Sequence, residues 1–227
     1  MRQLLERRFQ ALYDDACASL SGLELVRCNF ESCCLSMTTS PKKRTRVRDC
    51  VIRSCEQRGC TIEAALVERV RVEDLKSHGL LQCWAAAFRE VLFLGSMGRL
   101  MISAAVKSGM ASPEVQREFD AANREFYRHT SWAIDIRQAE FTECDIQGVP
   151  AGLILRDPET QVVVTREAAL RGEWRDLDLS GTHWAAALQL FLDRRDQDVV
   201  LVAGKKARNH KALVEGLELL KHRGIAT

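Results

Sequence analysis

Small or apolar residues recur at every fifth position from residue 50 to residue 85, and this spacing restricts the possible folds more than any other feature. The eight positions are Cys50, Cys55, Cys60, Ala65, Val70, Leu75, Leu80 and Ala85. A period of five fits neither an α-helix, with about 3.6 residues per turn, nor a strand, whose side chains alternate between two faces. It fits a chain that turns a corner every five residues and directs the first and third residue of each unit inward. Stacked coils of this kind bury a continuous core.

The same spacing occurs in two further segments, which contain five-residue units such as CNFES, AEFTE and CDIQG. These units resemble those of the pentapeptide-repeat proteins, in which a small residue, a polar residue and Leu or Phe precede two variable residues. The resemblance covers three segments, residues 23–37, 50–94 and 134–148. It implies a short right-handed, four-sided β-helix with about four units per coil. Some units, such as the one that contains Gln57, depart from the pattern.

The chain has nine cysteines, and their spacing favours packing over metal binding. Five-residue steps place Cys50, Cys55 and Cys60 on successive sides of a coil, where a thiol acts as a small apolar group. Structural zinc sites use pairs such as Cys-x2-Cys, and the sequence has no such pair. We therefore expect free thiols, no bound metal and no cofactor. The charged N-terminus is unlike a signal peptide and no apolar run is long enough to span a bilayer, so we expect a cytoplasmic protein.

Helical patterns flank and interrupt the repeats. Apolar residues recur with helical spacing over residues 2–20, which predicts a helix that caps the first coil. Ser112 can cap a helix and Pro113 suits its first turn, which predicts a long inserted helix over 112–129. We expect a β-helix domain over residues 1–181 that includes both helices.

The pattern changes after Gly148. Residues 151–165 have the pattern of two strands joined by a turn, and LDLSG at 177–181 resembles one more isolated unit. Residues 182–227 have a helix–strand–helix pattern, which predicts a C-terminal α/β element that either caps the coils or forms an appendage. Residues 84–92 fit a strand and a helix equally, and the pattern leaves both open.

Charge argues against several classes of partner. With 33 basic and 31 acidic residues, the net charge of +2 provides no global field for nucleic acid or an anionic membrane, and it does not suit a DNA mimic. One basic run lies between residues 42 and 48. No aromatic residue is interleaved with it for base stacking, so we expect a solvated loop.

Few residues form a chemical signature. Asp176 and Asp178 would point to the same side of a strand, and together with His183 they are candidates for acid–base catalysis. A second candidate is the loop between the last strand and the last helix, where a glycine and cations could bind phosphate at the helix N-terminus. Its residues are Gly204, Lys205, Lys206 and Arg208. The loop lacks the full P-loop pattern, and solvated polar residues are the competing interpretation at both places.

Two functions follow from these features. A patterned core without a reactive cluster favours a non-enzymatic interaction or scaffold module, and the family resemblance implies the same, although its acidic gyrase-binding members differ in charge. We expect a protein partner, another copy of the chain included, and a contact surface around Trp132, Trp174 and Trp184. The alternative is an enzyme, or a phosphate- or nucleotide-binding protein, that uses a groove between the coils and the 182–227 element.

Overall fold

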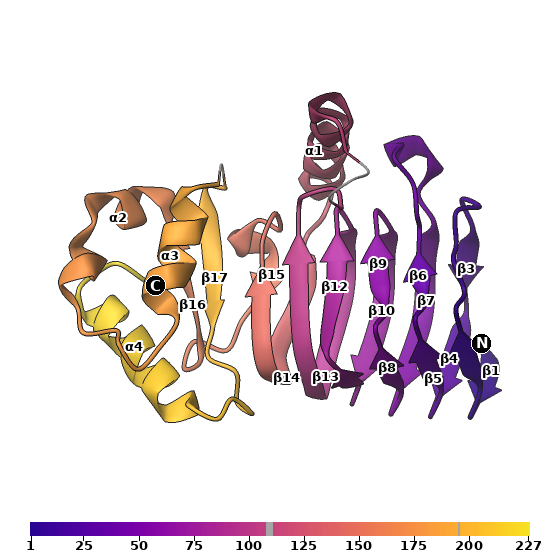
Figure 1. Ribbon diagram of the computed structural model, residues 1–227, viewed down its shortest axis with the longest axis horizontal. Helices are drawn as coiled ribbons and strands as arrows, with labels where there is room; N and C mark the ends of the chain where they lie inside the picture. Colours follow the sequence, from indigo (N-terminus) through magenta and orange to yellow (C-terminus); the bar gives the residue numbers. More distant parts are fainter. Residues whose placement is uncertain (108–110, 195) are drawn as a thin grey trace.

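The computed structural model describes residues 1–107, 111–194 and 196–227, and the fold is mainly β with some α. Figure 1 shows a row of strands that begins with the N-terminal level (indigo) and ends against a C-terminal unit of helices and strands (orange to yellow). The row consists of a large curled sheet and a small four-stranded sheet, and its strands pair in parallel. The parallel, solenoid-like arrangement expected from the repeats is confirmed.

The strands of the row are β1 (Arg2–Leu5), β2 (Arg8–Gln10), β3 (Ser19–Ser21), β4 (Leu23–Val26), β5 (Asn29–Glu31), β6 (Cys34–Leu35), β7 (Arg46–Arg53), β8 (Glu56–Arg58), β9 (Thr61–Glu63), β10 (Leu66–Glu73), β11 (Lys76–His78), β12 (Leu80–Trp84), β13 (Ala87–Ser103), β14 (Ile134–Ile146) and β15 (Ile154–Leu155). The C-terminal unit contains β16 (Gln161–Thr165), α2 (Arg166–Arg171), α3 (Trp184–Leu192), β17 (Asp198–Val202) and α4 (His210–His222). The remaining elements are α1 (Pro113–Arg128) and the 3-10 helices η1 (Pro41–Lys43), η2 (Ala151–Leu153) and η3 (Glu173–Asp176).

One level of the stack takes 20 or 21 residues. Arg46 of β7 pairs with Leu66 of β10, and Leu66 pairs with Ala87 of β13, all in parallel register. Similar offsets separate β2 from β5 and β8 from β11 on the smaller sheet, whereas the 38–45 loop widens the offset between β5 and β8. Four five-residue units fill one level, and this accounts for the period of five in the sequence.

The chain turns a corner at nearly every fifth residue by entering the left-handed backbone region. Successive corners with positive φ are Asp49, Ser54, Gly59, Ala64, Arg69, Asp74 and Gly79. This conformation costs a residue other than glycine about 1–2 kcal/mol, so packing between levels must offset the cost at the corners without glycine. The predicted five-residue corner is confirmed. The residues that follow these corners point inward, and Cys50, Cys55 and Cys60 are at most 8% exposed.

The predicted cap helix over residues 2–20 is wrong, because this segment forms the first level of the stack. Strands β1, β2 and β3 pair in parallel with β4, β5 and β7. Leu4 aligns with Leu25, and the ring of Phe9 stacks on that of Phe30 with centroids 5.0 Å apart. Over so short a segment, apolar residues four and five positions apart satisfy both a helical and a five-residue pattern. Pairing with the second level decides between the two.

The inserted helix predicted over 112–129 is confirmed as α1, with the hydroxyl of Ser112 accepting a hydrogen bond from a first-turn N–H at 3.3 Å. Phe119 of α1 is fully buried against Ala64 and Ala85, two corner residues of adjacent levels. Small side chains at these corners leave room for the ring. The helix therefore covers one edge of the stack.

Two further segments contain strands: one for which the sequence left strand and helix open, and one for which it predicted a loop. Residues 84–92 contain the end of β12, a corner at Ala85 and the start of β13, so the helical alternative is wrong. The basic run at 42–48 is only partly a loop, because Arg46 begins β7. Arg44 is buried beneath α1, where its guanidinium lies 4.7 Å from the centroid of the Phe119 ring.

The C-terminal helix–strand–helix is confirmed as α3, β17 and α4. Strands β15 and β16 lie on either side of the predicted turn, but they pair with β14 and β17 respectively rather than with each other. The expected isolated unit at 177–181 is wrong, since this segment contains no strand. A second hydrophobic cluster runs from Val162 to Ala226, upstream of the expected boundary at 181. Val200 of β17 belongs to the cluster of the stack and Leu201 to the second cluster, so β17 joins the two.

Candidate functional site

The three predicted acid–base residues form no joint hydrogen-bonded cluster among the described residues. Asp176 ends η3 and Asp178 follows outside any strand, so the expected placement of both on one side of a strand is wrong. Asp178 accepts hydrogen bonds from the hydroxyl and N–H of Ser180, and these lower the pKa of its carboxyl. His183 precedes α3, with its ring beside that of Trp184. No hydrogen bond or ion pair in the described chain joins any two of the three.

The predicted phosphate loop is engaged in structural contacts. The ammonium groups of Lys205 and Lys206 each lie near a carboxylate, at 3.0 and 3.1 Å. The acidic partners are Asp157 and Glu140 respectively. Gly204 packs on β14, where a Cβ atom would lie 2.6 Å from a backbone carbonyl oxygen, so the glycine permits close packing of loop and sheet. Arg208 is exposed, and it forms no ion pair with the residues that the structure describes.

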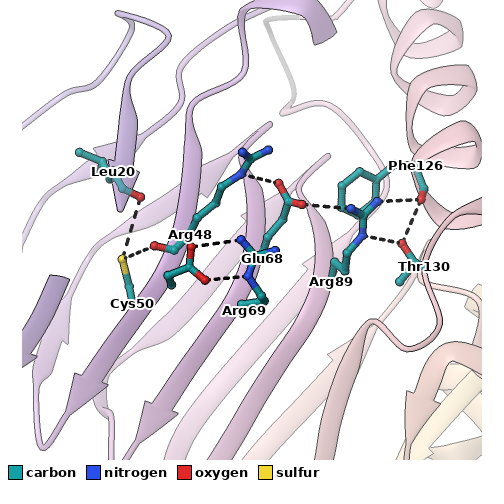
Figure 2. A network of polar contacts seen from close by, with 9 residues as sticks. Leu20, Arg48, Cys50, Glu68, Arg69, Arg89, Phe126 and Thr130 are labelled. Atoms are coloured by element: carbon teal, nitrogen blue, oxygen red, sulfur yellow. Dashed lines mark hydrogen bonds and ion pairs between the residues drawn. The ribbon is translucent and has the colours of Figure 1, made fainter. Parts of the chain in front are cut away.

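Ion pairs connect the levels along the sides of the stack. Glu68 of β10 pairs with Arg48 of β7 at 2.8 Å and with Arg89 of β13 at 3.2 Å, and its side chain is only 5% exposed. Figure 2 shows this row of charges continuing to α1, where Arg89 donates to the hydroxyl of Thr130 and lies over the ring of Phe126. The charges on this side are satisfied within the chain, which leaves few free groups for a partner.

A cleft of about 1010 Å³ lies between α1 and the segments that contain η2 and the start of β17. Asp196 lines it, and burial together with the nearby carboxylates of Asp198 and Asp120 raises its pKa. Arg124 of α1 also lines the cleft, and within the described ranges it has no ion-pair partner. A groove between the stack and the C-terminal unit therefore exists, but none of the predicted site residues lines it.

No strand of the described residues covers the first level of the stack. Strands β1, β2 and β3 each pair on one edge, with β4, β5 and β7, and no described strand pairs with the opposite edge. In Figure 1 this level is the free end of the row. Backbone N–H and C=O groups along a free strand edge are templates for pairing with another chain.

Large apolar side chains are exposed on this same level. They are Met1 (74%), Leu5 (46%), Leu12 (55%), Tyr13 (64%) and Leu20 (37%). The other exposed large apolar residues of the described chain lie on three different helices of the C-terminal unit. Exposed apolar groups gathered beside free strand edges mark a docking surface. The first level is therefore the candidate site.

The sequence placed the contact surface elsewhere. Of the predicted residues Trp132, Trp174 and Trp184, the last two are buried, and their indole N–H groups donate to backbone carbonyls of the C-terminal unit. That part of the prediction is wrong. The five-residue spacing of Leu4 and Phe9 already matched a level of the stack. The segment was missed as a level because its apolar residues also fit a helix.

Seven of the nine cysteines are buried and act as packing groups, whereas Cys33 is partly buried and Cys17 is exposed. All nine are free thiols, and burial raises the pKa of Cys55 to about 11 and that of Cys83 to about 12. No three His, Cys, Asp or Glu side chains in the described ranges are placed to hold one metal ion. A buried thiol with a raised pKa is a poor nucleophile and a poor metal ligand.

No protein-family model matches the chain, and no curated protein and no solved structure is significantly similar to it. Among the described residues, none of the helices combines the length and the apolar character needed to cross a membrane. A function has to be inferred from the geometry of the chain itself.

Proposed function

We propose that the stack is a right-handed, four-sided β-helix of the pentapeptide-repeat kind. Corners at five-residue intervals and levels of 20 or 21 residues support this proposal. Strands fall into four columns, which begin at β1, at β2, at the bridge between Tyr13 and Cys34, and at β3. Small side chains such as Cys55 and Ala65 suit the narrow interior of such a helix.

We propose that the protein is a non-enzymatic interaction module that binds a protein partner at its first level. The observation that carries this proposal is the coincidence of three free strand edges with five exposed apolar residues. A partner segment would complete the backbone hydrogen bonds of these edges, and the apolar side chains would supply buried area. Parallel pairing with the next level orders these edges before binding, and this reduces the entropy lost on association.

Site-specific photo-crosslinking in the expressing cell tests this function. A benzophenone amino acid is introduced at Tyr13 on the first level or, as the matched control, at Arg58 on a side of the stack, since both residues are exposed. We expect protein adducts from position 13 and only background from position 58. The absence of any adduct at position 13 would reject docking at this level.

We also propose a reducing compartment, the cytoplasm, for this protein. All nine cysteines are free thiols, although several of them stack in adjacent levels. Cys28 and Cys55 are one such pair, with the backbone N–H of Cys28 donating to the sulfur of Cys55 at 3.3 Å. Free thiols so close together persist where the surroundings keep them reduced.

A second candidate function is the binding of an anionic ligand, such as a phosphate ester or a nucleotide, in the cleft beside α1. Arg124 favours it, and about 1010 Å³ accommodates a small molecule. The carboxylates of Asp196 and Asp198 would repel an anion and weigh against it. A thermal-shift assay with millimolar ATP or inorganic phosphate tests this function. A rise in Tm that Arg124→Ala abolishes would support it, and no rise would reject it.

A further inference from the structure

The free first level fits a second copy of the same chain. We propose that two copies pack head to head through their first levels. This inference rests on the proposed docking function and names its partner. It is supported by the charges of the first level, by the arrangement of its edge strands, and by the cover on the opposite end of the stack.

Opposite sides of the first level each carry an exposed residue without an ion-pair partner among the described residues, and the two residues are of opposite charge. Arg2 begins the β1 side, and Asp15 ends the side that contains Tyr13; both are exposed, and neither forms an ion pair with another described residue. The four sides of the first level contain β1, β2, Tyr13 and β3 in chain order, so the β1 side lies opposite the Tyr13 side and the β2 side lies opposite the β3 side. A two-fold axis perpendicular to the β2 and β3 sides brings the β1 side of each copy over the Tyr13 side of the other. Arg2 of one copy then faces Asp15 of the other, and symmetry repeats this contact. The first level is thus complementary in charge to itself.

The same axis places β2 of one copy against β2 of the other in antiparallel orientation. Antiparallel edges exchange N–H···O=C bonds, so the free backbone groups of both strands are satisfied. Phe9 lies at the centre of β2 and already stacks on Phe30 of the second level. Pairing centred on Phe9 sets the two Phe9 residues opposite each other and extends this stack across the interface. The exposed Leu12, Tyr13 and Leu20 become covered at the same time.

The opposite end of the stack is closed to such contacts. Strand β14 pairs with β15 and with β17, and Ile134, Ile136 and Phe141 are at most 1% exposed. Among the described residues this end therefore has no exposed apolar level like the first one, and a contact between two identical first levels closes at two copies. In a closed dimer the free, partly apolar strand edges of the two first levels cover each other.

Sedimentation velocity across a dilution series tests the dimer. The variants Asp15→Arg and Arg2→Glu each place like charges opposite one another twice, and we expect each to weaken dimerisation at least about tenfold. An equimolar mixture of the two variants should recover an affinity within about threefold of the wild type, because opposite charges again meet at both contacts. The control Arg58→Glu changes charge on a side of the stack and should leave the dimer intact.

Several results would overturn the proposal. They are a wild-type chain that stays monomeric at about 100 µM, a dimer that neither variant weakens, and a mixture that does not recover. Circular dichroism melting curves establish that the variants fold. A monomeric wild type whose position 13 crosslinks to a different protein would reject the second copy as partner and leave the docking function in place. Absence of both dimer and adduct would reject both.

Discussion

The first level and the inner levels of the stack are built from the same repeat and differ in what lies on either side of them. Leu12 and Leu100 occupy one inward-facing column, which passes through Cys33, Cys60 and Leu81. Leu100 is 4% exposed between β12 and β14, whereas Leu12 is 55% exposed at the free end. The position in the five-residue unit decides where a side chain points. The presence of a neighbouring level decides whether that side chain is buried.

The largest contrast should appear in thiol reactivity. Cys17 is exposed on the first level, whereas Cys55 is fully buried two levels further in, with a pKa raised to about 11 by burial. At pH 8 we expect a thiol reagent to modify Cys17 at least about a thousand times faster than Cys55, which must wait for local opening. Mass spectrometry of labelled peptides over time measures both rates. Comparable rates would show that the inner levels are as open as the first, and Cys17→Ser should remove the fast phase.

The second contrast concerns packing. Leu100→Ala should lower the free energy of unfolding by about 3 kcal/mol, since it leaves a cavity between two levels. Leu12→Ala removes the same atoms from the free end and should cost less than about 1 kcal/mol in the monomer, because solvent already reaches the side chain. Urea unfolding at a dilution where the chain is monomeric measures both. Equal losses would mean that the first level is covered in solution.

The third contrast separates a buried from an exposed ion pair. Glu68→Gln removes the charge that links Arg48 and Arg89 and should destabilise the fold by about 2 kcal/mol, because two partly buried guanidinium groups lose their counter-ion. The matched control is Glu143→Gln. Its pair with Arg99 is about half exposed on both sides, and its loss should cost no more than about 0.5 kcal/mol. Urea unfolding in low and high salt distinguishes the two.

The smallest contrast is in pH dependence. Hydrogen bonds from Arg53 and Arg71 lower the pKa of the Glu73 carboxyl below its usual 4.5. The ionised carboxylate therefore stabilises the fold above pH 4.5, and this stabilisation is lost as the pH falls through the lower pKa of the folded state. Burial instead raises the pKa of the Asp145 carboxyl above its usual 3.8. The protonated carboxyl is favoured in the folded state, so stability is lost as the pH rises from 3.8 through the higher pKa of the folded state.

The free energy of unfolding, measured from pH 3 to 7, tests this difference between Glu73 on a side of the stack and Asp145 at the covered end. Glu73→Gln should flatten the loss of stability in acid, and Asp145→Asn should make that loss steeper, each by less than about 1 kcal/mol. Changes of the same sign in both variants would contradict the assigned pKa directions.

Local patterns were enough to predict the corners, the inward thiols and α1. A left-handed corner every five residues and a capped helix at Ser112 depend on neighbours within a few positions along the chain. Residues 2–20 and 84–92 were ambiguous because a short apolar segment satisfies two periods. Partners 20 or more residues away decided both in favour of strands.

The candidate site escaped prediction for a different reason. Exposure of Tyr13 and burial of Trp174 follow from what packs against each residue and not from residue type. The ion pairs of Lys205 and Lys206 likewise need carboxylates that the fold brings from distant segments. A sequence can suggest such groups, but it does not show whether they are free.

The sequence by itself determined the repeating unit, because a corner and an inward side chain are properties of five consecutive residues. Only the tertiary structure decided which level ends the stack, which charges are paired, and where backbone edges stay free. Burial and hydrogen bonding between levels depend on residues that lie adjacent in space and 20 or more positions apart in the chain. Arg2, the first inward position of the stack, pairs with Leu23 on one side, and no described strand pairs with it on the other.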